Sequence, residues 1–417
     1  MHVQHQSARQ SSAITEPGSR FFVIAALSLG PAVANSFARF AYALLLPAMR
    51  SELGLSYSQA GALNAANALG YLAGALFSAA YVSRLGNRRL FGAGMVVTVM
   101  ALVGSGLVDA FGAQLGLRAV AGAGGAMVFI CGAVLASNLF PGRPDLSSGA
   151  IAVYFGGAGA GILLSGVGIP WLLAAAGDGA WRSAWLAIGI VSTLFAILGI
   201  RAAALIEEPS SGARNSPWPI GAFHAALGSY FLVGIGYIVY MTFVVAWMVS
   251  QGASALDVAL TWGTLGVATM LAPIAWRVPR SRWPPAKTLA ATAIVLGAGA
   301  AMPLYSTSLP AMVLSAFLFG AAMFTAPTAV TDLVKTSLPR TAWGSAVAVF
   351  TVVFAIGQAI GPVVAGWLAD ATQSLRAGLA GSVALLLAAG MVAMLQRESK
   401  SATRSATRAS ACGSASH

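Results

Sequence analysis

Long stretches without a single charged residue constrain this chain more than any other feature of its sequence. Eight of them lack Asp, Glu, Lys and Arg: residues 53–83, 90–108, 119–142, 146–177, 183–200, 258–276, 341–369 and 377–396. A helix crosses the hydrocarbon core of a bilayer in about 20 residues. Charged residues make up only 8% of the 417 residues, whereas a soluble domain has about 25%. The sequence therefore predicts an integral membrane protein.

Two longer uncharged stretches, residues 215–256 and 288–331, need trimming or division. In the first, two prolines precede a helix that we expect from about Ala222 to Ser250. In the second, a turn cluster at 306–310 leaves one helix on each side. An N-terminal span from Phe21 to Met49 completes the count, and the span that contains the stretch 119–142 begins near Gln114 and includes Arg118. We expect an all-α membrane protein with twelve transmembrane helices.

The basic residues gather on one side of these spans. Along alternating loops, 18 of the 23 Lys and Arg residues fall on the side of the N-terminus, and two lie within spans; the remaining three are Arg50, Arg182 and Arg376. Basic loops remain in the cytoplasm, so both termini are expected there. The net charge of +12 is thus explained by topology, and nucleic acid is not expected as a partner.

One substantial linker divides the chain into two halves. The expected order is a cytoplasmic N-terminal tail (1–20), a six-helix bundle (21–201), a cytoplasmic linker (202–220), a second six-helix bundle (221–396) and a disordered basic cytoplasmic tail (397–417). The last segment contains a direct repeat of Ser-Ala-Thr-Arg, a low-complexity composition that cannot form a packed core.

An internal repeat relates the two halves. Gly54-x-Ser56 recurs as Gly252-x-Ser254 at an offset of 198 residues, and Gly157, Gly161 and Gly166 recur as Gly357, Gly361 and Gly366 at an offset of 200. Repeated halves are typical of transporters. Small residues on one helix face permit close helix contact in lipid, either as a sliding contact between the halves or as static packing. Asp257, three residues after Ser254, is expected to form a capping box.

Three motifs resemble those of the major facilitator superfamily. The loop Ser83-Arg84-Leu85-Gly86-Asn87-Arg88-Arg89 resembles its Asp-Arg-x-Gly-Arg-Arg/Lys loop, with Ser83 in place of the usual Asp and Asn87 in place of a basic residue. Arg118-x-x-x-Gly122 resembles a motif associated with proton coupling, and Gly357-x-x-x-Gly361-Pro362-x-x-Ala365-Gly366 resembles an antiporter motif that usually lies in the fifth span, not the eleventh. The resemblance implies two six-helix bundles around a central cavity, with coupling or gating roles for Arg84, Gly86, Arg88, Arg118, Gly122, Gly357, Gly361, Pro362 and Gly366.

Within that superfamily, the segments 38–47 (ARFAYALLLP) and 54–61 (GLSYSQAG) look like those of the YbfB/YjiJ-type bacterial group. This resemblance implies a multi-pass carrier in the bacterial inner membrane. It implies no particular substrate.

No pattern for catalysis, metal binding or ATP hydrolysis is visible. The four histidines, His2, His5, His224 and His417, form no metal-ligand cluster with Cys131 or Cys412. No Walker motif occurs. We therefore expect no enzyme activity, no metal and no cofactor, and the energy for transport should come from a gradient or from exchange.

Arg39 and Arg118 are the two charged residues within spans, where a charge costs at least about 2.5 to 3.5 kcal/mol. Either a substrate or structural partners such as backbone carbonyls, amides or Asp109 could stabilise them. Helical spacing places Asn35 and Tyr42 beside Arg39, and the offset of 198 aligns Tyr237 and Tyr240 with Arg39 and Tyr42. The candidate substrate-binding residues are Asn35, Arg39, Tyr42, Asn64, Asn67, Tyr71, Tyr237 and Tyr240.

The favoured function is secondary active transport of a small solute by alternating access, driven by a proton gradient or by exchange. An organic anion is the favoured substrate class because Arg39 is cationic. A proton-coupled multidrug efflux transporter is the alternative, and a channel or a sensor fits less well. The expected partners are the solute, protons and the lipid bilayer, with the chain acting as a monomer.

Overall fold

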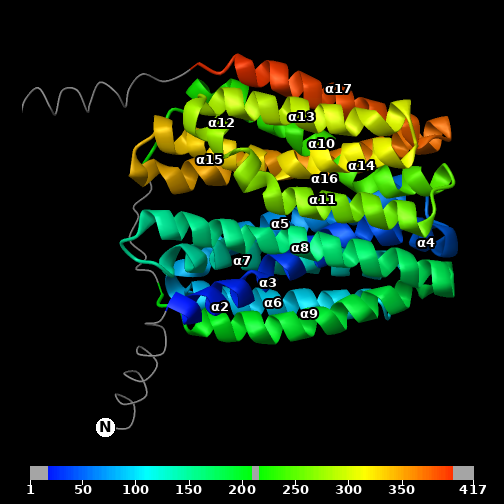
Figure 1. The fold of residues 1–417 in the computed structure, drawn as a ribbon, viewed down its shortest axis with the longest axis horizontal. Coiled ribbons are helices and arrows are strands. Elements are labelled where there is room, and N and C mark those ends of the chain that lie inside the picture. The colour runs from blue at the N-terminus through cyan, green and yellow to red at the C-terminus, as the bar shows by residue number, and fades with distance from the viewer. Residues whose placement is uncertain (1–16, 209–215, 398–417) are drawn as a thin grey trace, which may run out of the picture.

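The structure, a computed structural model, describes residues 17–208 and 216–397. Twelve helices in this part of the chain are long and apolar enough to cross a membrane, and no strand occurs in it. The expected all-α fold with two six-helix bundles is thereby confirmed (Figure 1). The predicted tails lie outside the described residues, apart from 17–20 and 397.

The first bundle contains six spans. Its first span is divided into α2 (Pro17–Leu27), α3 (Leu29–Pro31), the π-helix η1 (Ala32–Phe40) and α4 (Ala41–Leu53). The others are α5 (Tyr57–Leu85), α6 (Asn87–Ser105), α7 (Phe111–Asn138), α8 (Pro144–Ala176), and α9 (Trp181–Ala204), which the short 3-10 helix η2 (Asp178–Ala180) precedes. In η1 the wider turn is visible where the N–H of Ala41 donates to Ser36, five residues earlier.

The second bundle repeats this arrangement. Its helices are η3 (Ile220–Phe223), α10 (His224–Ser250), α11 (Ala255–Ala275), α12 (Arg277–Arg282), α13 (Pro285–Tyr305), α14 (Leu309–Met323), α15 (Thr325–Ser337), η4 (Arg340–Ala342), α16 (Trp343–Thr372) and α17 (Leu375–Met394). The helical structure is interrupted between α13 and α14, at the predicted turn cluster. Equivalent capping boxes, Ser56 with Gln59 and Ser254 with Asp257, begin α5 and α11. The predicted capping role of Asp257 is confirmed.

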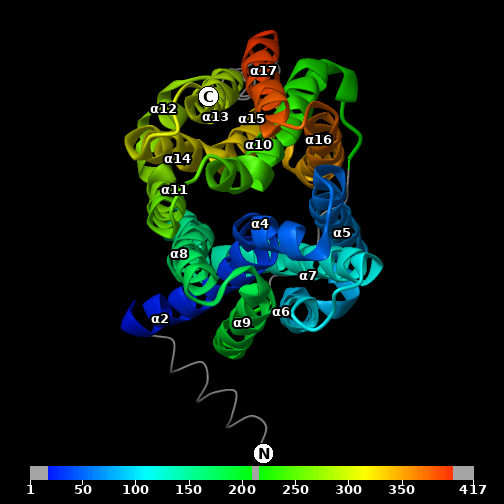
Figure 2. The ribbon, with the colours of Figure 1, turned by 90° about the vertical axis from the view of Figure 1, so that its right-hand side faces the viewer.

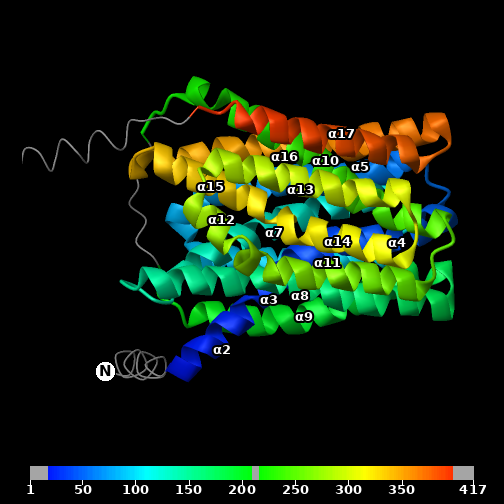
Figure 3. The same ribbon diagram turned by 45° about the horizontal axis from the view of Figure 1, so that its top comes forward.

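The two ends of the molecule differ. The start of α2 and the end of α17 lie at one end, which we call the terminal end (Figures 1 and 3). The opposite, distal end carries the turns at Gly54, Gly252 and Gln373. Seen from the distal end, α5 lies beside α16 and α8 beside α11, so these four helices join the bundles (Figure 2).

The repeated glycines make equivalent contacts in the two bundles. A Cβ on Gly161 would meet Ala32 and Ser36 of the first span, and one on Gly361 would meet Ile235 and Ile238 of α10. These glycines, and Gly157 and Gly357 one turn earlier, pack within one bundle. By contrast, Gly166 meets Trp262 of α11, and Gly366 meets Tyr57 of α5, across the bundle interface. In each motif the first two glycines therefore pack within one bundle, and the third contacts the other bundle.

These contacts set the register of the first span against α10. The Cβ positions of Gly157 and Gly357 face Ser28 and Phe231, an offset of 203 residues (231 − 28). The offset of 198 was read from the following pair of spans, and it does not hold here. The symmetry argument that aligned Arg39 with Tyr237 assumed an offset of 198 and is therefore corrected.

Candidate functional site

Arg39 lies in the last turn of η1, near the middle of the first span, and is only 7% exposed. Its Nε and Nη2 atoms are buried and have no hydrogen-bond partner within residues 17–208 and 216–397. The guanidinium lies over the ring of Tyr71 in α5, with Cζ 5.6 Å from the ring centroid. Buried polar groups are normally hydrogen-bonded, so these two donors mark the position where a ligand acceptor is most needed.

Arg118 in α7 has a different environment, although it is also buried, with 1% exposed. Its Nη1 donates to Ala38 at 2.5 Å, its Nη2 to the carbonyl of Arg39 at 3.4 Å and its Nε to Leu63 at 3.5 Å. All three nitrogens therefore face backbone carbonyls, as the structural alternative required. The carbonyls of Ala38 and Arg39 belong to η1, so Arg118 supports the π-helix that carries Arg39.

Tyr42 and Asn67 lie with Arg118, not with Arg39. The Tyr42 hydroxyl donates to the carbonyl of Ala60 at 2.8 Å, and its ring lies 4.6 Å below the Arg118 guanidinium. The Asn67 amide donates to the carbonyl of Arg118 at 3.1 Å. These contacts join three different helices, and helical spacing within one span cannot show them from the sequence.

A cluster of aromatic rings adjoins Arg39 and crosses the bundle interface. We call it the central aromatic cluster, and its members are Phe40, Tyr71, Phe129, Tyr237 and Phe324. Tyr71 contacts Phe129, Phe129 stacks on Phe324 at 6.3 Å, and Phe40 contacts both Phe324 and Tyr237. Tyr71, Phe129 and Phe324 face this interface yet remain only partly buried.

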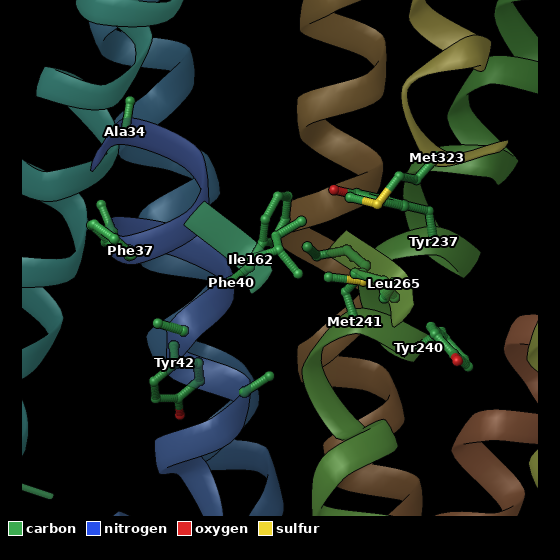
Figure 4. Packing of buried hydrophobic residues seen from close by; sticks show 14 of the residues in the cluster. Ala34, Phe37, Phe40, Tyr42, Ile162, Tyr237, Tyr240, Met241, Leu265 and Met323 are labelled. Carbon is green, nitrogen blue, oxygen red and sulfur yellow. The ribbon is translucent and has the colours of Figure 1, made fainter. Parts of the chain in front are cut away.

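Tyr237 and Tyr240 of α10 point in different directions. Tyr237 points toward the first bundle, where its ring contacts Phe40, the residue after Arg39, with centroids 6.4 Å apart (Figure 4). Tyr240 points away from that bundle, stacks on Phe319 and pairs with the hydroxyl of Ser315 at 2.7 Å (Figure 4). The expectation that both hydroxyls face Arg39 is therefore corrected for Tyr240, whose hydroxyl has its partner inside the second bundle.

Asn64 joins the bundles by donating from Nδ2 to Thr242 of α10, while its Oδ1 is buried without a partner. Asn35 lies buried in η1, one turn before Arg39. Sequence reasoning missed Tyr230, whose ring stacks on Phe354 with centroids 4.4 Å apart, while Tyr237 stacks on the same Phe354 ring at 6.0 Å. The signal was present, because residues seven apart, such as Tyr230 and Tyr237, share one helix face.

The loop before α6 lacks the usual Asp, yet a carboxylate lies there. Glu208, which follows α9, accepts hydrogen bonds from the backbone N–H groups of Asn87 and Arg88. It also forms an ion pair with Arg88, with Nε and Oε2 3.3 Å apart. An acidic group at a helix N-terminus is stabilised by the helix dipole. Glu208 thus supplies from the linker the charge that Ser83 cannot supply.

The other candidate gating residues lie in the loop before α6 or at close helix contacts. Gly86 has a φ of +80°, which favours glycine, and Arg84 is exposed. A Cβ on Gly122 would overlap the carbonyl of Asn67, so this glycine lets α7 approach α5 closely. The carbonyl of Pro362 lies where a Cβ on Gly61 would be, at the contact between α16 and α5.

The bundles are connected by hydrogen bonds at the distal end. Asp370 of α16 accepts from the backbone N–H groups of Tyr57 and Ser58 at 2.8 and 2.9 Å, and from the Ser58 hydroxyl at 2.6 Å. The Tyr57 ring also contacts Phe243 of α10 at 6.3 Å. At the terminal end, the Arg88–Glu208 and Arg280–Asp332 ion pairs each remain within one bundle. The contacts therefore favour a state in which the distal ends are closed.

Known transporters resemble this chain in sequence or in fold. The family model described as uncharacterised MFS-type transporter YbfB matches residues 31–394. A mutant of the nucleoside transporter NupG is similar, with a TM-score of 0.71 and 11% identity over 90% of this chain and 99% of that chain. A bacterial homologue of the human lysosomal transporter Spinster, inward-facing and unoccupied, gives a TM-score of 0.68 and 17% identity over 92% and 99% of the two chains. The inward-facing and occupied structure of that homologue gives a TM-score of 0.69 and 17% identity, over 90% of this chain and 96% of that chain. No curated protein matches the sequence.

Proposed function

This chain belongs to the YbfB-type family of major facilitator superfamily transporters, and we propose that it carries a small organic anion that Arg39 binds between the two bundles. The multi-pass fold and the family support secondary transport of a small solute. The observation that carries the choice of an anion is the buried guanidinium of Arg39, with two donors that no group in the described part of the chain accepts.

The surrounding charges also favour an anion. Arg39 lies near the middle of the first span and Arg118 lies seven residues after the start of α7, whereas every Asp and Glu of residues 17–208 and 216–397 lies in a loop or within five residues of the end of a span. A positive charge inside the membrane is stabilised by an opposite charge or by strong hydrogen bonds. Arg118 has its carbonyl partners, so a bound anion is the compensating charge for Arg39.

Alternating access requires the distal contacts to break. Asp370 with Ser58, and Asn64 with Thr242, are hydrogen bonds between different bundles. When the bundles rock about the central aromatic cluster, these bonds would open while the terminal ends close. Rocking of two repeats about a fixed site is the general mechanism of such carriers.

The proposed orientation places the terminal end in the cytoplasm of a bacterial cell and the chain, as a monomer, in its inner membrane. The support is the surplus of Lys and Arg in the loops of the terminal end. The proposed units remain residues 21–201 and 221–396, joined by the linker 202–220. The energy would come from a proton gradient or from exchange, and since acidic groups lie only near helix ends, protonation of the substrate is one route for coupling.

A ligand screen on the purified full-length protein tests this proposal. Sodium salts of carboxylates, phosphate esters and sulfonates, together with sugars and cationic drugs, would be compared by differential scanning calorimetry, because a ligand of the folded state raises the unfolding temperature. We expect organic anions to stabilise the wild type and the Arg376→Gln control but not Arg39→Gln. Stabilisation by cationic drugs alone, or stabilisation that persists in Arg39→Gln, would overturn the proposal. A radiolabelled hit would then be followed into proteoliposomes with and without a pH gradient.

A further inference from the structure

We infer that the anion is a carboxylate with one negative charge and an aromatic body. This inference rests on the proposed function and narrows its substrate class. It follows from the shape of the donors that Arg39 offers, from the charge available at the site and from the side chains around it.

The shape of the free donors fits a carboxylate. The N–H of Nε and one N–H of Nη2 point in the same direction along one edge of a guanidinium. These are the two Arg39 nitrogens that are buried without a hydrogen-bond partner among the described residues. A planar carboxylate accepts both in parallel, which gives the strong bidentate arrangement. Because Tyr71 lies against the guanidinium face, the acceptor has to approach this edge.

The charge available at the site fits one carboxylate. Arg118 already donates to three backbone carbonyls, and the other Lys and Arg residues of the described chain lie toward helix ends or in loops. A second carboxylate on the substrate would therefore remain unpaired in a region where unpaired charges are costly. This argument disfavours dicarboxylates and doubly charged phosphate esters.

The walls of the site fit an aromatic body. The five rings of the central aromatic cluster come from α5, α7, η1, α10 and the junction between α14 and α15, so both bundles contribute. Aromatic pairs gain about 0.5 to 1.5 kcal/mol beyond the burial of their area. Three of these rings remain partly exposed and can therefore receive another ring. The Tyr237 hydroxyl, which points toward the first bundle, can pair with a polar substituent on the ligand (Figure 4).

A panel of matched ligands tests the three parts of the inference. Benzoate, phenylacetate and indoleacetate would be compared with benzamide, cyclohexanecarboxylate and terephthalate by isothermal titration calorimetry on the full-length protein. Losing the hydrogen bonds to a charged group should weaken binding of benzamide relative to benzoate by about 10- to 100-fold. Terephthalate and cyclohexanecarboxylate should also bind more weakly than benzoate. These comparisons use only the wild-type protein, so their outcome does not depend on whether a variant folds.

Variants of Arg39 test whether the ligand binds to the parallel donors Nε and Nη2. Arg39→Gln should lose benzoate binding. Arg39→Lys should also lose most of it, since an ammonium group keeps the charge but cannot present two parallel donors. Arg376→Gln, which removes an exposed arginine at the distal end, is the matched control and should bind as the wild type does.

The possible failures are distinguishable. Binding of dicarboxylates or phosphate esters that depends on Arg39, without binding of any aromatic monocarboxylate, would overturn this inference and leave the proposed function standing. Equal affinity for benzoate and cyclohexanecarboxylate would overturn the aromatic part. If no anion of any class binds in a manner that depends on Arg39, the proposed function fails as well.

Discussion

The carboxylate of Asp370, in the last turn of α16, caps the first turn of α5 in the opposite bundle through both the N–H and the hydroxyl of Ser58. A helix N-terminus has unpaired N–H donors and a partial positive charge. Here the cap comes from the other half of the molecule, so it can exist only while the distal ends are together. The same hydrogen bonds that complete α5 therefore also act as a latch between the bundles.

Asp370→Asn should weaken this latch and increase the population with open distal ends. Losing a charge-assisted cap costs about 1 to 2 kcal/mol, which corresponds to a roughly 5- to 30-fold change in the closed-to-open ratio. Double electron–electron resonance between labels at Asp178 and Gln251, one in each bundle, would measure it after replacement of both native cysteines. An unchanged distance distribution would contradict the assignment of Asp370 as a latch.

Arg118→Gln and Arg39→Gln should have opposite consequences for stability. The first variant leaves the carbonyls of Ala38 and Arg39 without their donor, with a loss on the order of 3 kcal/mol. The second removes a buried charge whose donors have no protein partner, so it should unfold at the same or a higher temperature. Calorimetry without ligand compares the two. A similar drop in unfolding temperature in both variants would show that Arg39 is a structural residue.

Gly366→Ala should disrupt the contact between α16 and α5. Its Cβ would overlap the carbonyl of Tyr57, and overpacking typically costs about 1 to 3 kcal/mol. We expect open distal ends in the resonance experiment and reduced transport of any substrate that the screen identifies. Gly381→Ala is the control, because a Cβ there has no neighbour within 4 Å, and it should behave as the wild type. Wild-type behaviour of both variants would refute the close contact.

The ion pairs at the distal end of the first bundle should make stability depend on acid pH. The hydrogen bond from Arg182 lowers the pKa of Asp109 below its ordinary value of 3.8, and Arg182 also pairs with Glu52. A carboxylate with a lowered pKa stabilises the folded state above its unfolded pKa, and this contribution is lost as the pH falls through the folded pKa. The unfolding temperature should therefore decrease below about pH 4, and less steeply in Asp109→Asn. Identical pH profiles would exclude this contribution.

Much of the fold was accessible from the sequence. The uncharged stretches predicted twelve spans because a bilayer excludes unpaired charge, and the Ser254–Asp257 spacing predicted a helix start through local hydrogen bonds. Arg39 was singled out by the cost of a charge inside a span. Each of these inferences depends on the solvent or on a few neighbouring residues, so no tertiary contact was needed to make it.

Which polar groups have partners was decided only by the tertiary structure. Arg118 meets carbonyls of α5 and η1, and Glu208 reaches a loop more than a hundred residues earlier. Tyr42 packs under Arg118 of α7, and the contacts of Gly157 and Gly357 pair the first span with α10 at an offset other than 198. Hydrogen bonds between distant segments depend on how helices approach and rotate, and one extra residue in a helical turn rotates every side chain after it. The sequence by itself thus determined that an arginine inside a span must have hydrogen-bond acceptors or an opposite charge. The packing of the two bundles decided that, among the described residues, Arg118 has such acceptors, whereas Nε and Nη2 of Arg39 have none.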